Sequence, residues 1–102
     1  MKKMIALYRA PEDVQAFLDH YREVHMPLVR KVPGLTRVEL TRIEKTVVGE
    51  KGNFLLAELV FATPEAFQAA MRSPENAAAG ADVMAFAGEL VTVMTGEVIE
   101  LG

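Results

Sequence analysis

His25 is the residue best suited to acid–base chemistry in this chain of 102 residues. An imidazole titrates near neutral pH, so it can remove a proton next to a carbonyl group or protonate a leaving oxygen. Tyr21 precedes it by one helical turn, which lets the phenol share a wall with the imidazole and orient a substrate oxygen. The structural alternatives are that His25 hydrogen-bonds the backbone carbonyl that Pro27 leaves free, and that Tyr21 is core packing.

Glu58 is the second candidate, because it is the one carboxylate in the apolar run 54–61. A carboxylate in such surroundings costs several kcal/mol unless it is paired or protonated. It would therefore be either an acid of a pocket, working beside His25, or one half of an ion pair with a neighbouring strand. We favour the ion pair, and the arginines available for it are Arg9, Arg37 and Arg42.

Four more side chains are expected to contact a ligand. Tyr8 ends the first apolar segment and can face the same cavity as the residues above. Phe17 and Leu28 lie on the apolar stripe that carries His25. Arg37 can bind an anionic group, although the alternative is that it gives its strand a solvated face.

Composition excludes several classes of protein. The chain has no cysteine, which removes disulfide frameworks, thiolate metal sites and cysteine nucleophiles. Its net charge of −3 offers no large basic surface for a nucleic acid. The apolar segment near residue 5 is far shorter than a signal peptide or a membrane span. We therefore expect a cytoplasmic protein with neither a membrane nor a nucleic acid as partner.

The second histidine, His20, is expected to be exposed, since charged residues surround it in the sequence. It precedes His25 by five residues, a poor spacing for two ligands on one helical face, and no acidic cluster completes a site. Neither a metal nor another cofactor is expected, and a single-histidine haem ligand is the one alternative.

The elements that must position these residues follow from periodicity and capping signals. Strands are expected at 4–8, 35–43, 54–61 and 90–99. A helical stripe is expected from about residue 11 to 32, with a kink or break where Pro27 removes a backbone N–H. Thr63-Pro64-Glu65 and Ser73-Pro74-Glu75 each open a further helix. This order predicts a single α+β domain, 1–102, of ferredoxin-like βαββαβ type, with a four-stranded antiparallel sheet and its helices on one side.

One face of that sheet needs a cover. The run 54–61 is apolar at seven of eight positions, which is typical of a strand buried on both faces. The helices can cover only one face. A second copy of the chain, stacked sheet on sheet, is the simplest cover, so we expect a homodimer through the sheet face.

Two segments resemble the EthD-like family of dimeric α+β barrels. Tyr21–Val29, followed by Pro33-Gly34-Leu35, resembles the family's aromatic-x-x-x-His-x-Pro-Leu helix and Pro-Gly-Leu turn. Ser73-Pro74-Glu75, with Asp82 and Phe86 downstream, is similar to its second helical region. The resemblance spans nearly the whole chain, and it implies a homodimer with a small pocket between helix and sheet in each subunit.

Relatives with this fold include lactone isomerases, polyketide cyclases, quinone-forming monooxygenases and haem-degrading enzymes, so the fold alone does not define the reaction. We expect cofactor-free acid–base chemistry by His25, Tyr21 and Glu58 on a small apolar carbonyl or phenolic compound in catabolism. The alternative is a non-catalytic protein that binds such a compound or assists an oxygenase pathway, and a bare scaffold ranks third. The residues alone do not separate the first two.

Overall fold

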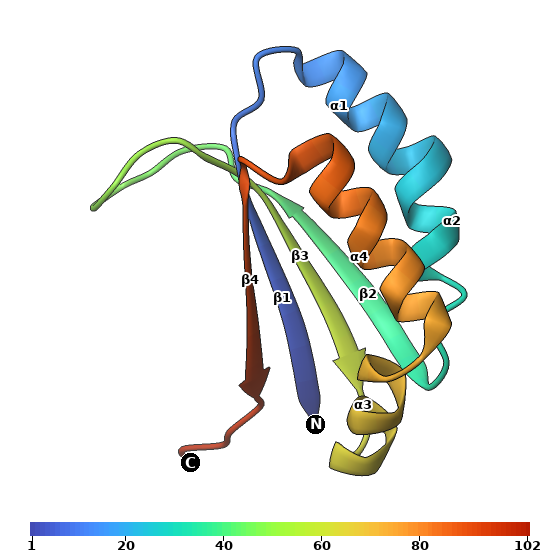
Figure 1. The fold of residues 1–102 in the computed structure, drawn as a ribbon. Helices are drawn as coiled ribbons and strands as arrows, with labels where there is room; N and C mark the ends of the chain where they lie inside the picture. Colours follow the sequence, from blue (N-terminus) through green and yellow to red (C-terminus); the bar gives the residue numbers. More distant parts are fainter.

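A four-stranded antiparallel sheet forms one layer of the computed structural model, which describes residues 1–102 (Figure 1). Its strands are β1 (Lys2–Arg9), β2 (Leu35–Arg42), β3 (Asn53–Phe61) and β4 (Val91–Glu97). They lie in the order β2-β3-β1-β4, so the first and third strands occupy the centre. The longer helices lie together against one face of the sheet. This arrangement is the predicted ferredoxin-like fold.

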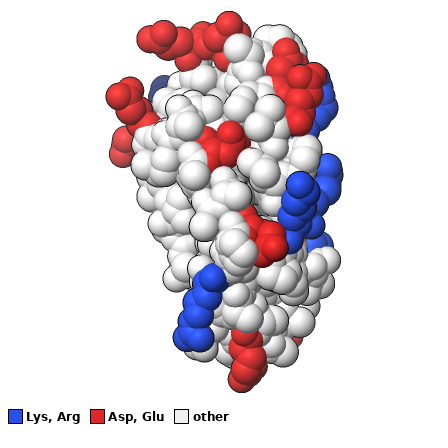
Figure 2. All heavy atoms as spheres, turned by 45° about the vertical axis from the view of Figure 1, so that its right-hand side comes forward, with Lys and Arg blue, Asp and Glu red and all other residues white.

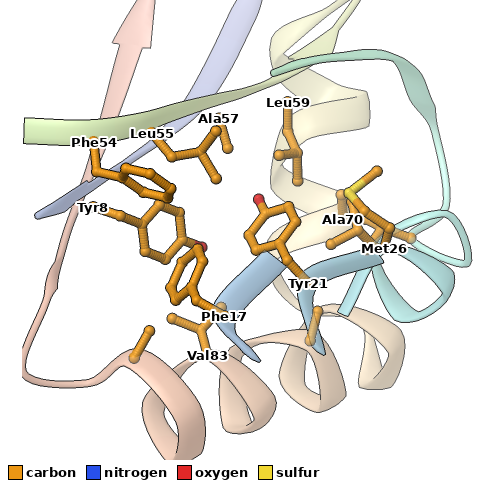
Figure 3. Close-up of a cluster of buried hydrophobic side chains, with 14 of the residues drawn as sticks. Tyr8, Phe17, Tyr21, Met26, Phe54, Leu55, Ala57, Leu59, Ala70 and Val83 are labelled. Atoms are coloured by element: carbon orange, nitrogen blue, oxygen red, sulfur yellow. The ribbon is translucent and has the colours of Figure 1, made fainter. Parts of the chain in front are cut away.

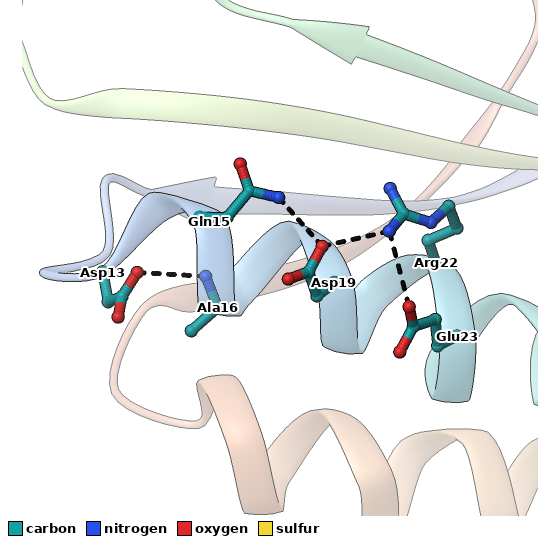
Figure 4. Close-up of polar contacts among 6 residues, drawn as sticks. All are labelled: Asp13, Gln15, Ala16, Asp19, Arg22 and Glu23. Atoms are coloured by element: carbon teal, nitrogen blue, oxygen red, sulfur yellow. Dashed lines mark hydrogen bonds and ion pairs between the residues drawn. The ribbon is translucent and has the colours of Figure 1, made fainter.

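A helical rod follows β1. It consists of α1 (Val14–His20), the π-helical turn η1 (Tyr21–His25) and α2 (Met26–Val29). The carboxylate of Asp13 caps the rod by accepting a hydrogen bond of 3.0 Å from the backbone N–H of Ala16 (Figure 4). The helix therefore begins later than the expected residue 11, because Asp13 is the cap rather than a first-turn residue. It also ends earlier than the expected residue 32.

The expected disturbance at Pro27 takes the form of the π-turn. Proline lacks an N–H, so the carbonyl of Glu23 loses the partner that an α-helix would give it. The backbone N–H of Met26 donates instead to the carbonyl of Tyr21, five residues back. The chain stays helical through this point, so the rod accommodates one extra residue in a turn and does not break.

Two more helices connect β3 to β4, and they are α3 (Pro64–Met71) and α4 (Pro74–Ala87). Thr63 caps α3 by accepting from the backbone N–H of Ala66 at 3.1 Å. Ser73 caps α4 by accepting from that of Asn76 at 3.1 Å. Each helix then begins at the proline that follows its cap, as the sequence predicted.

The hydrophobic core lies between the helices and the sheet, as one cluster of 15 buried residues. Alternation along β3 directs Leu55, Ala57 and Leu59 toward the helices. Tyr8 of β1 and Tyr21 of the rod reach the same layer (Figure 3). These two tyrosines are thus embedded in the packing that holds the two layers together.

The other face of the sheet carries no helix. Register places Ile5 between Glu58 of β3 and Met94 of β4, and Leu7 opposite Leu56. Apolar side chains of the two central strands and β4 therefore lie on this face together with the carboxylate of Glu58. We call the surface formed by Ile5, Leu7, Leu56, Glu58 and Met94 the open face.

On the helix-covered side, separate acidic and basic groups are scattered over a mostly uncharged surface (Figure 2). Helix α4 lies on this side and is rich in alanine. None of the helices is long and apolar enough to span a bilayer.

Candidate functional site

A cavity of about 190 Å³ lies between the helical layer and the sheet. From the sheet it is lined by Met4, Ala6, Tyr8, Ala57, Leu59 and Val93. The helices contribute Tyr21, His25, Val29, Asn76, Ala79, Gly80, Val83 and Met84. Polar side-chain groups come only from Tyr8, Tyr21, His25 and Asn76, so the cavity suits a small, mostly apolar ligand with few polar atoms.

His25 forms part of the cavity wall and is only 4% exposed. Its Nδ1 lies 3.0 Å from Oδ2 of Asp82, which belongs to α4. An ionised carboxylate only accepts hydrogen bonds, so Nδ1 donates and Nε2 carries the lone pair. The ring therefore bonds to a side chain and not to the carbonyl freed by Pro27, contrary to the structural alternative. Burial lowers the pKa of His25 below its ordinary value of 6.5, while the hydrogen bond and charge of Asp82 oppose that shift.

Tyr8 and Tyr21 stand next to each other on the cavity wall, with ring centroids 5.6 Å apart and planes at 90°. Their hydroxyl oxygens point into the space between the two rings (Figure 3). The ring of Tyr21 is also 4.9 Å from that of His25. Burial raises the pKa of both phenols, so both stay protonated and are able to donate to a ligand oxygen.

Asp82 belongs to the candidate site although the sequence pattern singled it out only through the family resemblance. It is the one acidic side chain in α4 beyond the first turn. Its carboxylate is 14% exposed and accepts from the rod across the helix–helix contact. A lone carboxylate among alanines is a usable signal, because a half-buried charge needs a partner.

The expectation for His20 was wrong. Its Nε2 lies 2.9 Å and 3.1 Å from the two oxygens of Asp82, and its side chain is 33% exposed. A five-residue spacing separates two side chains on a regular α-helix, whereas the π-turn brings His20 and His25 to one carboxylate. Both imidazoles hydrogen-bond the carboxylate of Asp82, and the three side chains do not form a group that could hold a metal ion.

Glu58 does not join this site. It follows Ala57 on β3, so its side chain lies on the opposite face of the sheet from the cavity. There its Oε2 lies 2.8 Å from Nζ of Lys3 on β1. The favoured interpretation, an ion pair with a neighbouring strand, therefore describes the structure, but the partner is a lysine and none of the three arginines. The proposed work beside His25 within one subunit is excluded by this geometry.

The other side chains expected to contact a ligand mostly lie outside the cavity. Phe17 packs in the core, 5.5 Å from Tyr8 between ring centroids, and Leu28 is half-buried against the same core; neither lines the cavity. Arg37 hydrogen-bonds Glu39 at 2.9 Å and borders a separate, open depression of about 560 Å³ at the edge of the sheet. Of the four expected ligand contacts, only Tyr8 thus lines the cavity that His25 lines.

The fold and the site together define a class: a ferredoxin-like α+β protein with an apolar cavity and a His–Asp pair in its wall. The chain belongs to the EthD family, because the EthD domain model matches residues 9–89. An EthD family protein of Bacillus halodurans has a crystal structure with a TM-score of 0.90 and 47% identity, over 97% of this chain and 99% of that one. An uncharacterised 11.0 kDa protein from the thcB–thcC intergenic region of Rhodococcus erythropolis is 32% identical, over 92% of this chain and 91% of its own length.

More distant solved structures share the fold alone. A ferredoxin-like protein of unknown function from Jannaschia, described as dimeric, matches with a TM-score of 0.68 and 19% identity, over 96% of this chain and all of that one (100%). SnoaB of Streptomyces nogalater, described as a cofactor-independent oxygenase, matches with a TM-score of 0.65 and 18% identity, over 99% of this chain and 93% of that one. Such distant likeness places the fold and carries no residue roles.

Proposed function

We propose that this protein performs cofactor-free acid–base chemistry on a small, mostly apolar carbonyl or phenolic compound, with His25 as the base. The observation that carries the proposal is the position of His25 in the wall of an apolar cavity, with Nδ1 held by Asp82 at 3.0 Å. That hydrogen bond leaves Nε2 unprotonated as the nitrogen able to take a proton from a bound compound.

The two phenols supply hydrogen-bond donors for an oxygen of the bound compound. A carbonyl oxygen placed between Tyr8 and Tyr21 would accept from both hydroxyls, since burial keeps them protonated. Removal of a proton from the adjacent carbon would place negative charge on that oxygen, where the two donors stabilise it. The imidazolium formed at His25 would in turn be stabilised by the carboxylate of Asp82.

The lowered pKa of His25 supports this assignment, because burial keeps the imidazole neutral at the pH where a base must accept a proton. The fold-level likeness to a cofactor-independent oxygenase supports it by analogy only. A cytoplasmic location and a role in catabolism stay predictions from the sequence.

Hydrogen–deuterium exchange tests the proposal without a known reaction. A panel of small ketones and phenols is incubated with the protein in D₂O, and loss of the protons on carbon next to the oxygen-bearing carbon is followed by NMR. We expect at least one compound to exchange faster with the native protein, and His25→Gln to slow that exchange by about 10²–10⁴-fold. Asp19→Asn, on the exposed side of α1, is the matched control and leaves the rate unchanged. Equal rates for the native and His25→Gln proteins would refute the assignment of the base.

A binding protein without catalysis is the second candidate, and one observation favours it. Eleven of the fourteen cavity-lining residues are hydrophobic, which suits retention of a ligand more than stabilisation of developing charge. In that case His25→Phe retains the affinity for a phenol such as p-cresol, measured by calorimetry, while no compound of the panel exchanges.

The proposal includes a homodimer through the open face. Apolar side chains of the central strands are presented there without a helix to cover them, and a second copy is self-complementary to them. The dimeric description of the Jannaschia protein, which has the same fold, supports this assembly.

A further inference from the structure

Asp82 accepts hydrogen bonds from two imidazoles, and only one of them reaches the cavity. His20 Nε2 lies 2.9 Å from Oδ1 and 3.1 Å from Oδ2, so it spans both oxygens. His25 Nδ1 uses Oδ2 alone, at 3.0 Å. The side chain of His20 is 33% exposed and that of His25 is 5% exposed. His20 is therefore the outer member of the group and does not line the cavity.

The π-turn is what makes this arrangement possible. In a regular α-helix, residues five apart point about 140° away from each other. The wider turn of η1 reduces that angle, so that His20 and His25 approach Asp82 from the same side of the rod. Single π-turns occur often at functional sites, because the inserted residue re-aims side chains at the expense of regular hydrogen bonding.

Phe86 supports the same geometry from α4, one helical turn after Asp82. Its ring centroid is 4.3 Å from that of His20 and 5.5 Å from that of His25. Helix α4 thus contacts both imidazoles twice, through an aromatic ring and through a shared carboxylate.

We propose that His20 is a positioning residue of the site: by contacting both oxygens of Asp82, it fixes the plane of the carboxylate so that Oδ2 accepts from His25 Nδ1 and Nε2 is left free for the cavity. The inference rests on the proposed function, because it assigns His20 a role in preparing the base. It adds a residue that neither contacts the ligand nor takes part in the proton transfer.

The physical reason is that a carboxylate alone would not hold this orientation. The terminal torsion of an aspartate is broad, and a partly exposed carboxylate can turn toward water. Which nitrogen of a neutral histidine carries the proton depends on the partner of the other nitrogen. If Oδ2 turns away, the Nδ1–H form of His25 loses its advantage, and the tautomer with Nε2–H cannot act as a base toward the cavity. Partners of this outer kind orient the groups that they contact.

Long-range ¹H–¹⁵N NMR of the imidazoles tests the proposal in the absence of any ligand. At a pH where the rings are neutral, the native protein should show His25 in the Nδ1–H form. His20→Leu removes the donor and should give a mixture of tautomers at His25. His20→Gln keeps an N–H donor for Asp82 and should restore the native tautomer. A His20→Leu protein with the native tautomer, or two variants that shift alike, would overturn the proposal.

This readout separates the inference from the proposed function. A tautomer that depends on His20, together with no proton exchange in any compound of the panel, would retain the positioning role and reject the catalytic one. An unaltered His25 tautomer in His20→Leu would reject the positioning role while leaving His25 as the base. Because His20 is partly exposed, its variants should stay folded, and far-ultraviolet circular dichroism verifies this.

Discussion

Asp82 and His25 are 57 residues apart in the chain, yet Oδ2 of the first lies 3.0 Å from Nδ1 of the second. This contact joins α4 to the π-turn of the rod and makes Nδ1 the donor, so that Nε2 carries the lone pair of the neutral ring. The proposed chemistry depends on this contact. Its removal should lower the free energy of unfolding by an amount that denaturation can measure.

Loss of the carboxylate should destabilise the fold. Asp82→Leu leaves the buried Nδ1–H of His25 without an acceptor, and an unsatisfied buried donor costs about 1–3 kcal/mol. Asp19→Asn removes an exposed partner of Arg22 (Figure 4) and should cost less than about 1 kcal/mol. Urea denaturation measures both values. Equal losses in the two variants would show that Asp82 has no special role in holding the helices together.

The free energy of unfolding should depend on the protonation of His25. Burial lowers the pKa of this residue in the folded protein, so the folded state binds fewer protons than the unfolded chain. The contribution of neutral His25 to the free energy of unfolding is complete above its ordinary pKa of 6.5. It is lost as the pH falls below that value toward the pKa of His25 in the folded protein. Denaturation at pH 8 and at successively lower pH should show this loss, and His25→Gln should lack it. If the free energy of unfolding falls by the same amount from pH 8 in the native protein and in His25→Gln, the pKa of His25 is not lowered by folding.

The overall fold could be predicted from local signals. Thr63-Pro64 and Ser73-Pro74 mark helix starts through a cap followed by a proline, and both helices begin at those prolines. Alternation and apolar runs located the strands, because a side chain on a strand faces one side or the other with period two. The exact start of the first helix was less predictable. Asp13 is its cap and not a first-turn residue, and an aspartate suits both positions.

The site was only partly predictable. Tyr21 and His25 share a wall because a four-residue spacing aligns side chains on any helix, and that is local information. The role of Asp82 depends on how α4 crosses the rod, and the position of His20 depends on a π-turn whose only local sign is Pro27. For Glu58, the ion pair with a neighbouring strand was predictable but the face was not, since a strand that is apolar on both faces gives no clue to which face a lone carboxylate occupies.

Gly80 provides a way to close the cavity. It lines the cavity from α4, and a Cβ added there meets no atom within 4 Å. Gly80→Ala should therefore stabilise the helix by about 0.5–1 kcal/mol, because glycine is a poor residue for a helix interior. The larger side chain of Gly80→Leu should occupy part of the cavity and weaken the binding of p-cresol, measured by calorimetry.

Gly88, at the end of the same helix, provides the matched control for Gly80→Ala. A Cβ at this position would lie 2.6 Å from the backbone oxygen of Met84, so Gly88→Ala should destabilise the protein. If Gly80→Leu binds p-cresol as tightly as the native protein does, the ligand does not occupy this cavity.

The open face should mediate the dimer. Ile5→Asp places a charge between Glu58 and Met94, where a second sheet would pack, and burial of an unpaired charge is strongly unfavourable. We expect sedimentation velocity to show a dimer for the native protein and a folded monomer for this variant. Val24→Asp, on the exposed side of the rod, should remain dimeric. A native protein that sediments as a monomer at micromolar concentration contradicts the proposed assembly.

The most direct measurement of the central claim is an NMR titration of protein labelled with ¹⁵N at histidine, using p-cresol as the probe. The cavity position of His25 predicts that its Nε2 resonance shifts as it accepts a hydrogen bond from the phenol, that His20 changes little, and that Gly80→Leu suppresses the shift. Saturating binding of p-cresol with an unaltered Nε2 resonance of His25 would contradict the claim that this nitrogen faces the ligand.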